Sequence, residues 1–120
     1  MDKLYIPGDL VYIHGSLRIV SNCDGYYATY YDENESLQEV NVNVIEGIPI
    51  TPEILEKNGW KVSSECRWIY VKEDNVKIFR LFDDIHYAAY IGFVRLLGFQ
   101  HIHQLQHLLF GLGINHEMEV

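Results

Sequence analysis

Residues 49–60 carry a complete set of signals for one short helix, from its start to its stop. Thr51 can cap the first turn, and Pro52 suits the first helical position, where its missing N–H would have no partner anyway. Gly59 then ends the helix, because glycine tolerates the left-handed backbone conformation. A helix of about two turns is marginal alone. We therefore expect it to pack on a larger unit, with Trp60 in the joint between two halves of the chain.

The chain before this helix is rich in β-forming residues. Runs at 10–14, 17–20, 26–31 and 37–44 are separated by residues typical of turns. Short strands at this spacing favour a small barrel. The opening Gly8-Asp9-Leu10-Val11, with Gly15 in the next turn, resembles the start of an SH3-like or KOW-type barrel, and the resemblance extends to about residue 50. It implies an architecture and no particular partner.

The chain after the helix predicts a sheet and a second helix. Runs at 66–72, 76–82 and 85–93 indicate a three-stranded antiparallel sheet, with a hairpin loop at 73–75. Leucines recur at helical spacing from about 101 to 111, which predicts a C-terminal helix with one apolar face. The expected fold is α+β. It forms a single compact domain of residues 1–120, with a barrel-like half at 1–50 and a helix, sheet and helix at 51–120.

Charge and hydropathy exclude several classes of function. Seventeen acidic and nine basic residues among 120 give a formal net charge of −8, which repels nucleic acid and anionic membrane surfaces alike. The start of the chain has no apolar run of signal-peptide length, and no segment approaches the ~20 apolar residues of a membrane span. The two cysteines have no CxxC spacing. We expect a soluble cytoplasmic protein that binds neither nucleic acid nor membrane.

Two longer motifs suggest an origin. The stretches TPEILEKNGW at 51–60 and IHQLQHLLF at 102–110 together resemble a group of small uncharacterised proteins of phages and mobile elements of gut bacteria. The resemblance implies a phage or prophage protein that works in the cytosol of a bacterial host. It carries no activity, substrate or site.

A pair of histidines in the last helix is a weak metal motif. His103 and His107 lie four residues apart, a spacing that lets two imidazoles share a zinc ion, but Gln104 stands where an HExxH motif has its glutamate. The sequence does not fix a third ligand among His86, His101, His116 and Glu117. We expect two polar residues on a solvated helix face and no metal; a metal-dependent hydrolase is the alternative.

The sequence gives equally little indication of other catalytic groups. The acidic pairs Asp83-Asp84 and Glu33 with Glu35 lie where turn residues are expected. Cys23 or Cys66 would need a neighbouring base to act as a nucleophile. With no catalytic motif, we predict a protein that is not an enzyme and uses no cofactor.

The outer face of the last helix is the best candidate for binding. Phe110 falls near His103, Gln106 and His107 on a helical wheel, opposite the leucines, so the four combine an aromatic centre with a polar rim. This pattern favours a protein partner or self-association; the alternative is that Phe110 packs under the C-terminal segment.

Two further features leave alternatives open. Four tyrosines alternate along 26–31, and the sequence does not decide whether Tyr26 and Tyr30 or Tyr27 and Tyr31 face solvent. A small-molecule pocket that sequesters a nucleotide is another interpretation of the chain. It would need a local cluster drawn from Arg18, Arg67 and Arg80.

Overall fold

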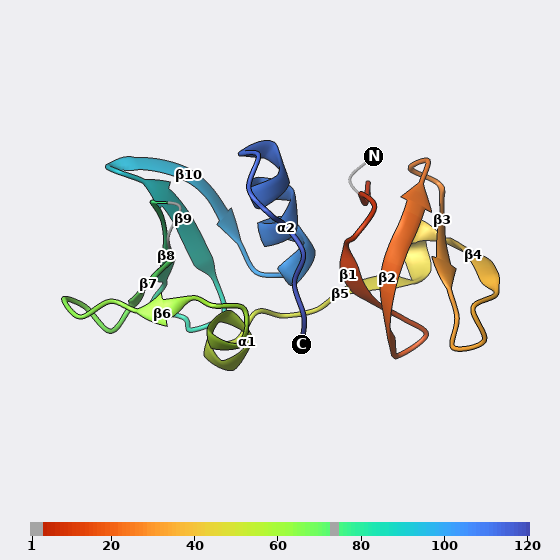
Figure 1. The fold of residues 1–120 in the computed structure, drawn as a ribbon, viewed down its shortest axis with the longest axis horizontal. Helices are drawn as coiled ribbons and strands as arrows, with labels where there is room; N and C mark the ends of the chain where they lie inside the picture. The colour runs from red at the N-terminus through yellow and green to blue at the C-terminus, as the bar shows by residue number, and fades with distance from the viewer. Residues whose placement is uncertain (1–3, 73–74) are drawn as a thin grey trace.

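The computed structural model describes residues 4–72 and 75–120, and these residues form an elongated α+β structure of 46 × 27 × 26 Å. The regular structure of the described chain is mostly two five-stranded antiparallel sheets, with one α-helix after the first sheet and one after the second along the chain (Figure 1). The predicted α+β class is confirmed. Neither helix of this part of the chain is long and apolar enough to cross a membrane.

The first sheet has the strand order β4-β3-β2-β1-β5. Its elements are β1 (Leu10–Ile13), β2 (Ser16–Cys23), β3 (Tyr27–Tyr31), β4 (Leu37–Asn41), the 3-10 turn η1 (Val42–Val44) and β5 (Ile45–Gly47).

Local turn chemistry explains where these strands begin and end. The Asp24 carboxylate accepts hydrogen bonds from the N–H groups of Tyr26 and Tyr27, both at 2.8 Å, and closes the turn between β2 and β3. The strand expected at 37–44 stops early, because the side chain of Asn41 accepts a hydrogen bond from the N–H of Asn43 and caps η1 instead.

The second sheet has the order β10-β9-β8-β7-β6, so the prediction of three strands is wrong. The strand expected at 85–93 ends at Ile91, because the chain reverses at Gly92, whose φ of 59° suits a tight turn, and the unpredicted strand β10 follows. Part of the expected loop, at 73–74, lies outside the described residues. The elements are α1 (Pro52–Lys57), β6 (Lys61–Val62), β7 (Ile69–Val71), β8 (Val76–Arg80), β9 (Tyr87–Ile91), β10 (Val94–Phe99) and α2 (Ile102–Gly111).

Helix α1 has the caps expected from the sequence. The hydroxyl of Thr51 accepts a hydrogen bond from the N–H of Ile54 at 3.2 Å. Gly59 has a φ of 89°, and the N–H of Trp60 returns to the carbonyl of Leu55 at 3.0 Å. Trp60 is 2% exposed and belongs to the larger of two apolar clusters.

Helix α2 lies between the two sheets (Figure 1). Its leucine face packs in the larger cluster, which also contains Leu10 of β1 and Ile48 after β5. The smaller cluster fills the inside of the first sheet with side chains such as Val11 and Val20. The chain that links the halves pairs with the start of α2, because the N–H of Ile102 donates to the carbonyl of Ile48 at 2.9 Å. The two halves therefore meet along α2 and the linking chain.

Candidate functional site

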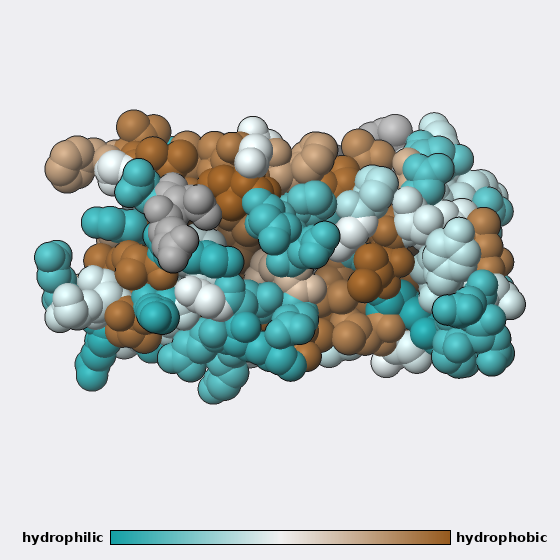
Figure 2. Space-filling view, viewed as in Figure 1, coloured by the Kyte–Doolittle hydropathy of each residue, from teal (hydrophilic) through white to brown (hydrophobic). Residues whose placement is uncertain are grey.

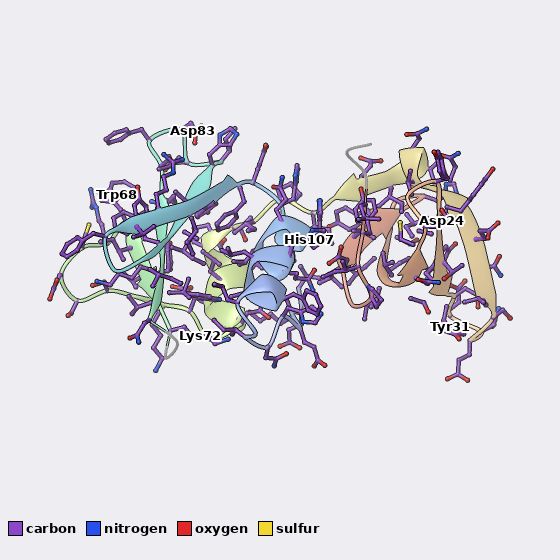
Figure 3. All side chains as sticks on the ribbon, turned by 90° about the horizontal axis from the view of Figure 1, so that it is seen from above. Asp24, Tyr31, Trp68, Lys72, Asp83 and His107 are labelled. Carbon is purple, nitrogen blue, oxygen red and sulfur yellow. The ribbon has the colours of Figure 1, made fainter. Side chains whose placement is uncertain are left out.

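The predicted binding residues of α2 lie at the junction of the two halves, where Figure 3 labels His107. The leucine face is buried as expected, with Leu105 fully covered. The opposite face was expected in solvent, and this is wrong for two of its members: Gln106 is fully buried and His103 is largely buried. The reason is tertiary, because residues 5–10 of the first half cover this side of the helix.

Gln106 joins the halves through the backbone. Its Oε1 accepts a hydrogen bond from the N–H of Leu10 at 2.8 Å. Its Nε2 donates to the carbonyls of Gly8 at 2.9 Å and His116 at 3.0 Å. The amide thus satisfies three backbone groups from two distant segments, which a buried polar side chain needs in order to be stable.

Asp9 and His107 form the second link of the junction. The Asp9 carboxylate is fully buried, and its Oδ2 lies 2.6 Å from Nε2 of His107 and accepts from the N–H of Ile6 at 3.0 Å. Its Oδ1 has no hydrogen-bond partner. A buried carboxylate is costly unless a donor or a positive charge compensates it. His107 therefore serves the packing of the junction rather than an open site.

His103 is a neutral histidine within this junction. Burial lowers its pKa to about 4, against the opposing effect of the nearby Asp9 carboxylate. Its ring packs on Tyr5 at 5.2 Å between centroids, and its Nδ1 is buried without a partner. The rings of His101 and His107 lie 5.7 and 5.8 Å away.

His107 and the neighbouring Gln104 already have hydrogen-bond partners in the structure. Among residues 4–72 and 75–120, no group of three or more His, Cys, Asp or Glu side chains is placed to hold a metal ion. His107 is engaged by Asp9, and Gln104 accepts from the N–H groups of Gln100 and His101 at the start of α2. The spacing of His103 and His107 is explained by packing.

Phe110 was expected either to form an exposed binding surface or to pack under the C-terminal segment, and it has features of both. It is 58% exposed, yet its ring meets that of His116 edge to face at 5.1 Å between centroids. It thus lies against the C-terminal segment and also faces solvent. The four predicted residues do not share one open surface, since Gln106 and His103 are covered.

The acidic residues and cysteines considered as catalytic candidates have the following contacts. The Asp83 carboxylate accepts from the N–H of His86, is hydrogen-bonded to the His86 ring and accepts from the N–H of Ile85, and these hydrogen bonds lower its pKa to about 2. Glu33 pairs with Arg18 at 2.8 Å. Cys23 and Cys66 are both free thiols.

The first sheet shows which tyrosines of residues 26–31 face solvent. Tyr30 is 8% exposed and belongs to the inner cluster of the first half, whereas Tyr26, Tyr27 and Tyr31 are exposed. Tyr31 pairs with Leu37 across β3 and β4, and both side chains point away from the inner cluster.

A row of exposed apolar side chains crosses this outer side of the first sheet. We call it the first-sheet face, made of Tyr12, Leu17, Ile19, Tyr31 and Leu37. Three of these residues, Leu17, Ile19 and Tyr31, line a shallow hollow of about 500 Å³. Its remaining lining comes from Leu10, Arg18, Val20 and Ser21. Sequence reasoning missed it, because β2 carries apolar residues on both sides and its alternation does not show which side is covered.

A second hollow lies at the far end of the other half, where Figure 3 labels Trp68. The guanidinium groups of Arg67 and Arg80 lie 5.0 and 4.7 Å from the centroid of the Trp68 ring system. The hollow measures about 290 Å³ and is also lined by Phe79 and Phe82. Arg18 is far along the chain from this cluster, in the first sheet, and pairs there with Glu33.

Comparison with protein-family models, curated proteins and solved structures finds no match to this chain.

Replacing Gln106 should lower the free energy of unfolding, because its side chain joins the two halves. Gln106→Leu keeps the bulk but leaves the N–H of Leu10 and the carbonyls of Gly8 and His116 without partners. We expect a loss of roughly 2–5 kcal/mol in the free energy of unfolding, measured by urea denaturation. The control Gln38→Leu, on the exposed surface of β4, should change it by less than about 1 kcal/mol. Equal losses would contradict the role of Gln106.

Stability should fall as the pH drops from about 6.5 to 4. In this window the unfolded chain takes up a proton on His103, and the folded chain, where burial lowers the pKa to about 4, does not. The effect reaches up to about 3 kcal/mol. In urea denaturation at a series of pH values, His103→Gln should show a flatter dependence across this window. An unchanged slope would show that His103 titrates alike in both states.

Proposed function

We propose that the chain is a non-enzymatic interaction protein whose partner binds the first-sheet face. One observation carries this proposal: Leu17, Ile19 and Tyr31 stay exposed around one hollow on the outer side of the first sheet. Isolated exposed apolar residues are ordinary, but a contiguous group on one surface is typical of a binding site. Nothing in the described part of the chain covers this group except at Leu10, where α2 begins to shield it.

The same proposal assigns the first half to the SH3-like class of barrels. The strand order β4-β3-β2-β1-β5 supports the assignment, as does the pairing of β1 with β5 after the 3-10 turn η1. This class hosts unrelated functions, so the assignment concerns architecture and does not name a ligand.

A phage or prophage origin and a place in the host cytosol are part of the proposal as well. Their support is the resemblance of the stretches at 51–60 and 102–110 to small phage proteins. The proposal does not include a metal-dependent hydrolase, because no contact of the described residues favours one at His103 and His107.

The proposal is tested by capture from bacterial host lysate with quantitative mass spectrometry. Ile19→Ser places a hydroxyl at the centre of the first-sheet face, and we expect at least one captured protein to decrease roughly tenfold, the effect of about 1.4 kcal/mol. Val62→Ser, an equally drastic change at an exposed position of β6, is the matched control. If both variants capture the same proteins as the unaltered chain, this face is not the binding surface.

A second candidate is a protein that sequesters a nucleotide at Trp68. The partly exposed ring of Trp68 lies close to the guanidinium groups of Arg67 and Arg80, so this place combines an aromatic surface with positive charge, the two features that bind a base and its phosphate. A thermal-shift screen against linear and cyclic nucleotides tests it. Binding at a hundredfold excess over Kd adds about 2.7 kcal/mol and raises the melting temperature. Trp68→Ala should abolish that rise; no rise with any nucleotide would refute this candidate.

A further inference from the structure

We infer that the partner of the first-sheet face is a short basic segment of another protein that carries apolar side chains. The inference rests on the proposed function and adds the chemical class of the partner. It follows from the register of the strands, the charges at the border of the face and the size of the apolar area.

The register places the apolar side chains in one continuous row. Leu37 is opposite Tyr31 across β4 and β3, and Leu10 is opposite Ile19 across β1 and β2. Ile19 and Tyr31 line the same hollow, which joins the two pairs. Residues directly opposite each other project from the same side of a sheet, so the row runs across four strands from the junction at Leu10 to the edge strand β4.

Acidic residues border this row on the same side of the sheet. Glu46 is opposite Tyr12 across β5 and β1, and Glu39 follows Leu37 by two residues on β4. Both glutamates are exposed. The turn between β3 and β4 adds Glu35, and Figure 2 shows hydrophilic residues in the lower part of this end of the molecule, beside a hydrophobic group at its edge.

The imbalance of charge extends over the whole first half. Residues 4–50 contain seven carboxylates and one cation, Arg18, which is already paired with Glu33. A second copy of this face, a nucleic acid or an anionic membrane would each bring like charge to the same border. A basic segment brings the opposite charge and is steered toward the face.

The dimensions favour a segment rather than a large globular surface. Adjacent strands lie about 4.8 Å apart, so a row across four strands measures roughly 14 Å. Stable globular complexes bury ≈ 800 Å² per partner, which needs a surface that extends well beyond a row of this length. The row therefore suits a weak, exchangeable contact with a short peptide.

Three synthetic peptides of equal length provide the probes: one of alternating lysine and leucine blocks, one with glutamate in place of lysine, and one with serine in place of leucine. Binding to the full chain is measured by fluorescence titration. We expect the Lys/Leu peptide to bind. Its affinity should fall roughly tenfold in Ile19→Ser and roughly tenfold in the double variant Glu39→Lys, Glu46→Lys. Val62→Ser should leave it unchanged.

The outcomes separate this inference from the proposed function. If the Glu/Leu peptide binds as tightly as the Lys/Leu peptide and depends equally on Ile19, the face is a binding site but the basic partner class is wrong. If the Lys/Ser and Lys/Leu peptides bind alike and Ile19→Ser has no effect, both proposals fail. Tyr31→Ser serves the same purpose should Ile19→Ser not fold. Sedimentation showing a dimer that Ile19→Ser dissociates would identify a second copy as the occupant and overturn the inference.

Discussion

The buried amide of Gln106 is the interaction on which the arrangement of the two halves depends. Helix α2 belongs to the second half through its leucines, but this one side chain also holds the backbone of Gly8 and Leu10. A buried amide must satisfy its donors and its acceptor, and the observed placement of the first sheet does so. Asp9 makes a second polar contact across the same junction by reaching His107. Apolar packing therefore brings the halves together, and polar pairing fixes how they meet.

This junction also decides which surfaces remain free. Helix α2 covers the first sheet only at its inner end, where Leu10 is buried. The apolar row continues past that point to Ile19 and Tyr31 without cover from the described residues. A protein of this size can leave apolar area exposed without losing its fold, because each half already has its own cluster of buried side chains. The exposed row is thus free to serve binding.

The histidines of α2 show how burial changes what a motif can do. His103 and His107 have the spacing of a metal pair, but one is kept neutral by burial and the other is held by a buried carboxylate. Their geometry is that of a packed joint between two sheets. The two proposals for binding rest instead on surface features, the hollow of the first half and the Trp68 ring beside Arg80 in the second.

The sequence by itself determined the features whose partners lie within a few residues: the caps of α1 at Thr51 and Gly59, the turn at Asp24 and the α+β class. These depend on local backbone geometry and on residue periodicity, which a single sequence displays. Tertiary structure alone decided that Gln106, on the polar side of α2, is buried, because the bond from Leu10 to Gln106 spans 96 residues. It also decided that Ile19 stays exposed, since the two apolar sides of a strand look alike until packing covers one of them.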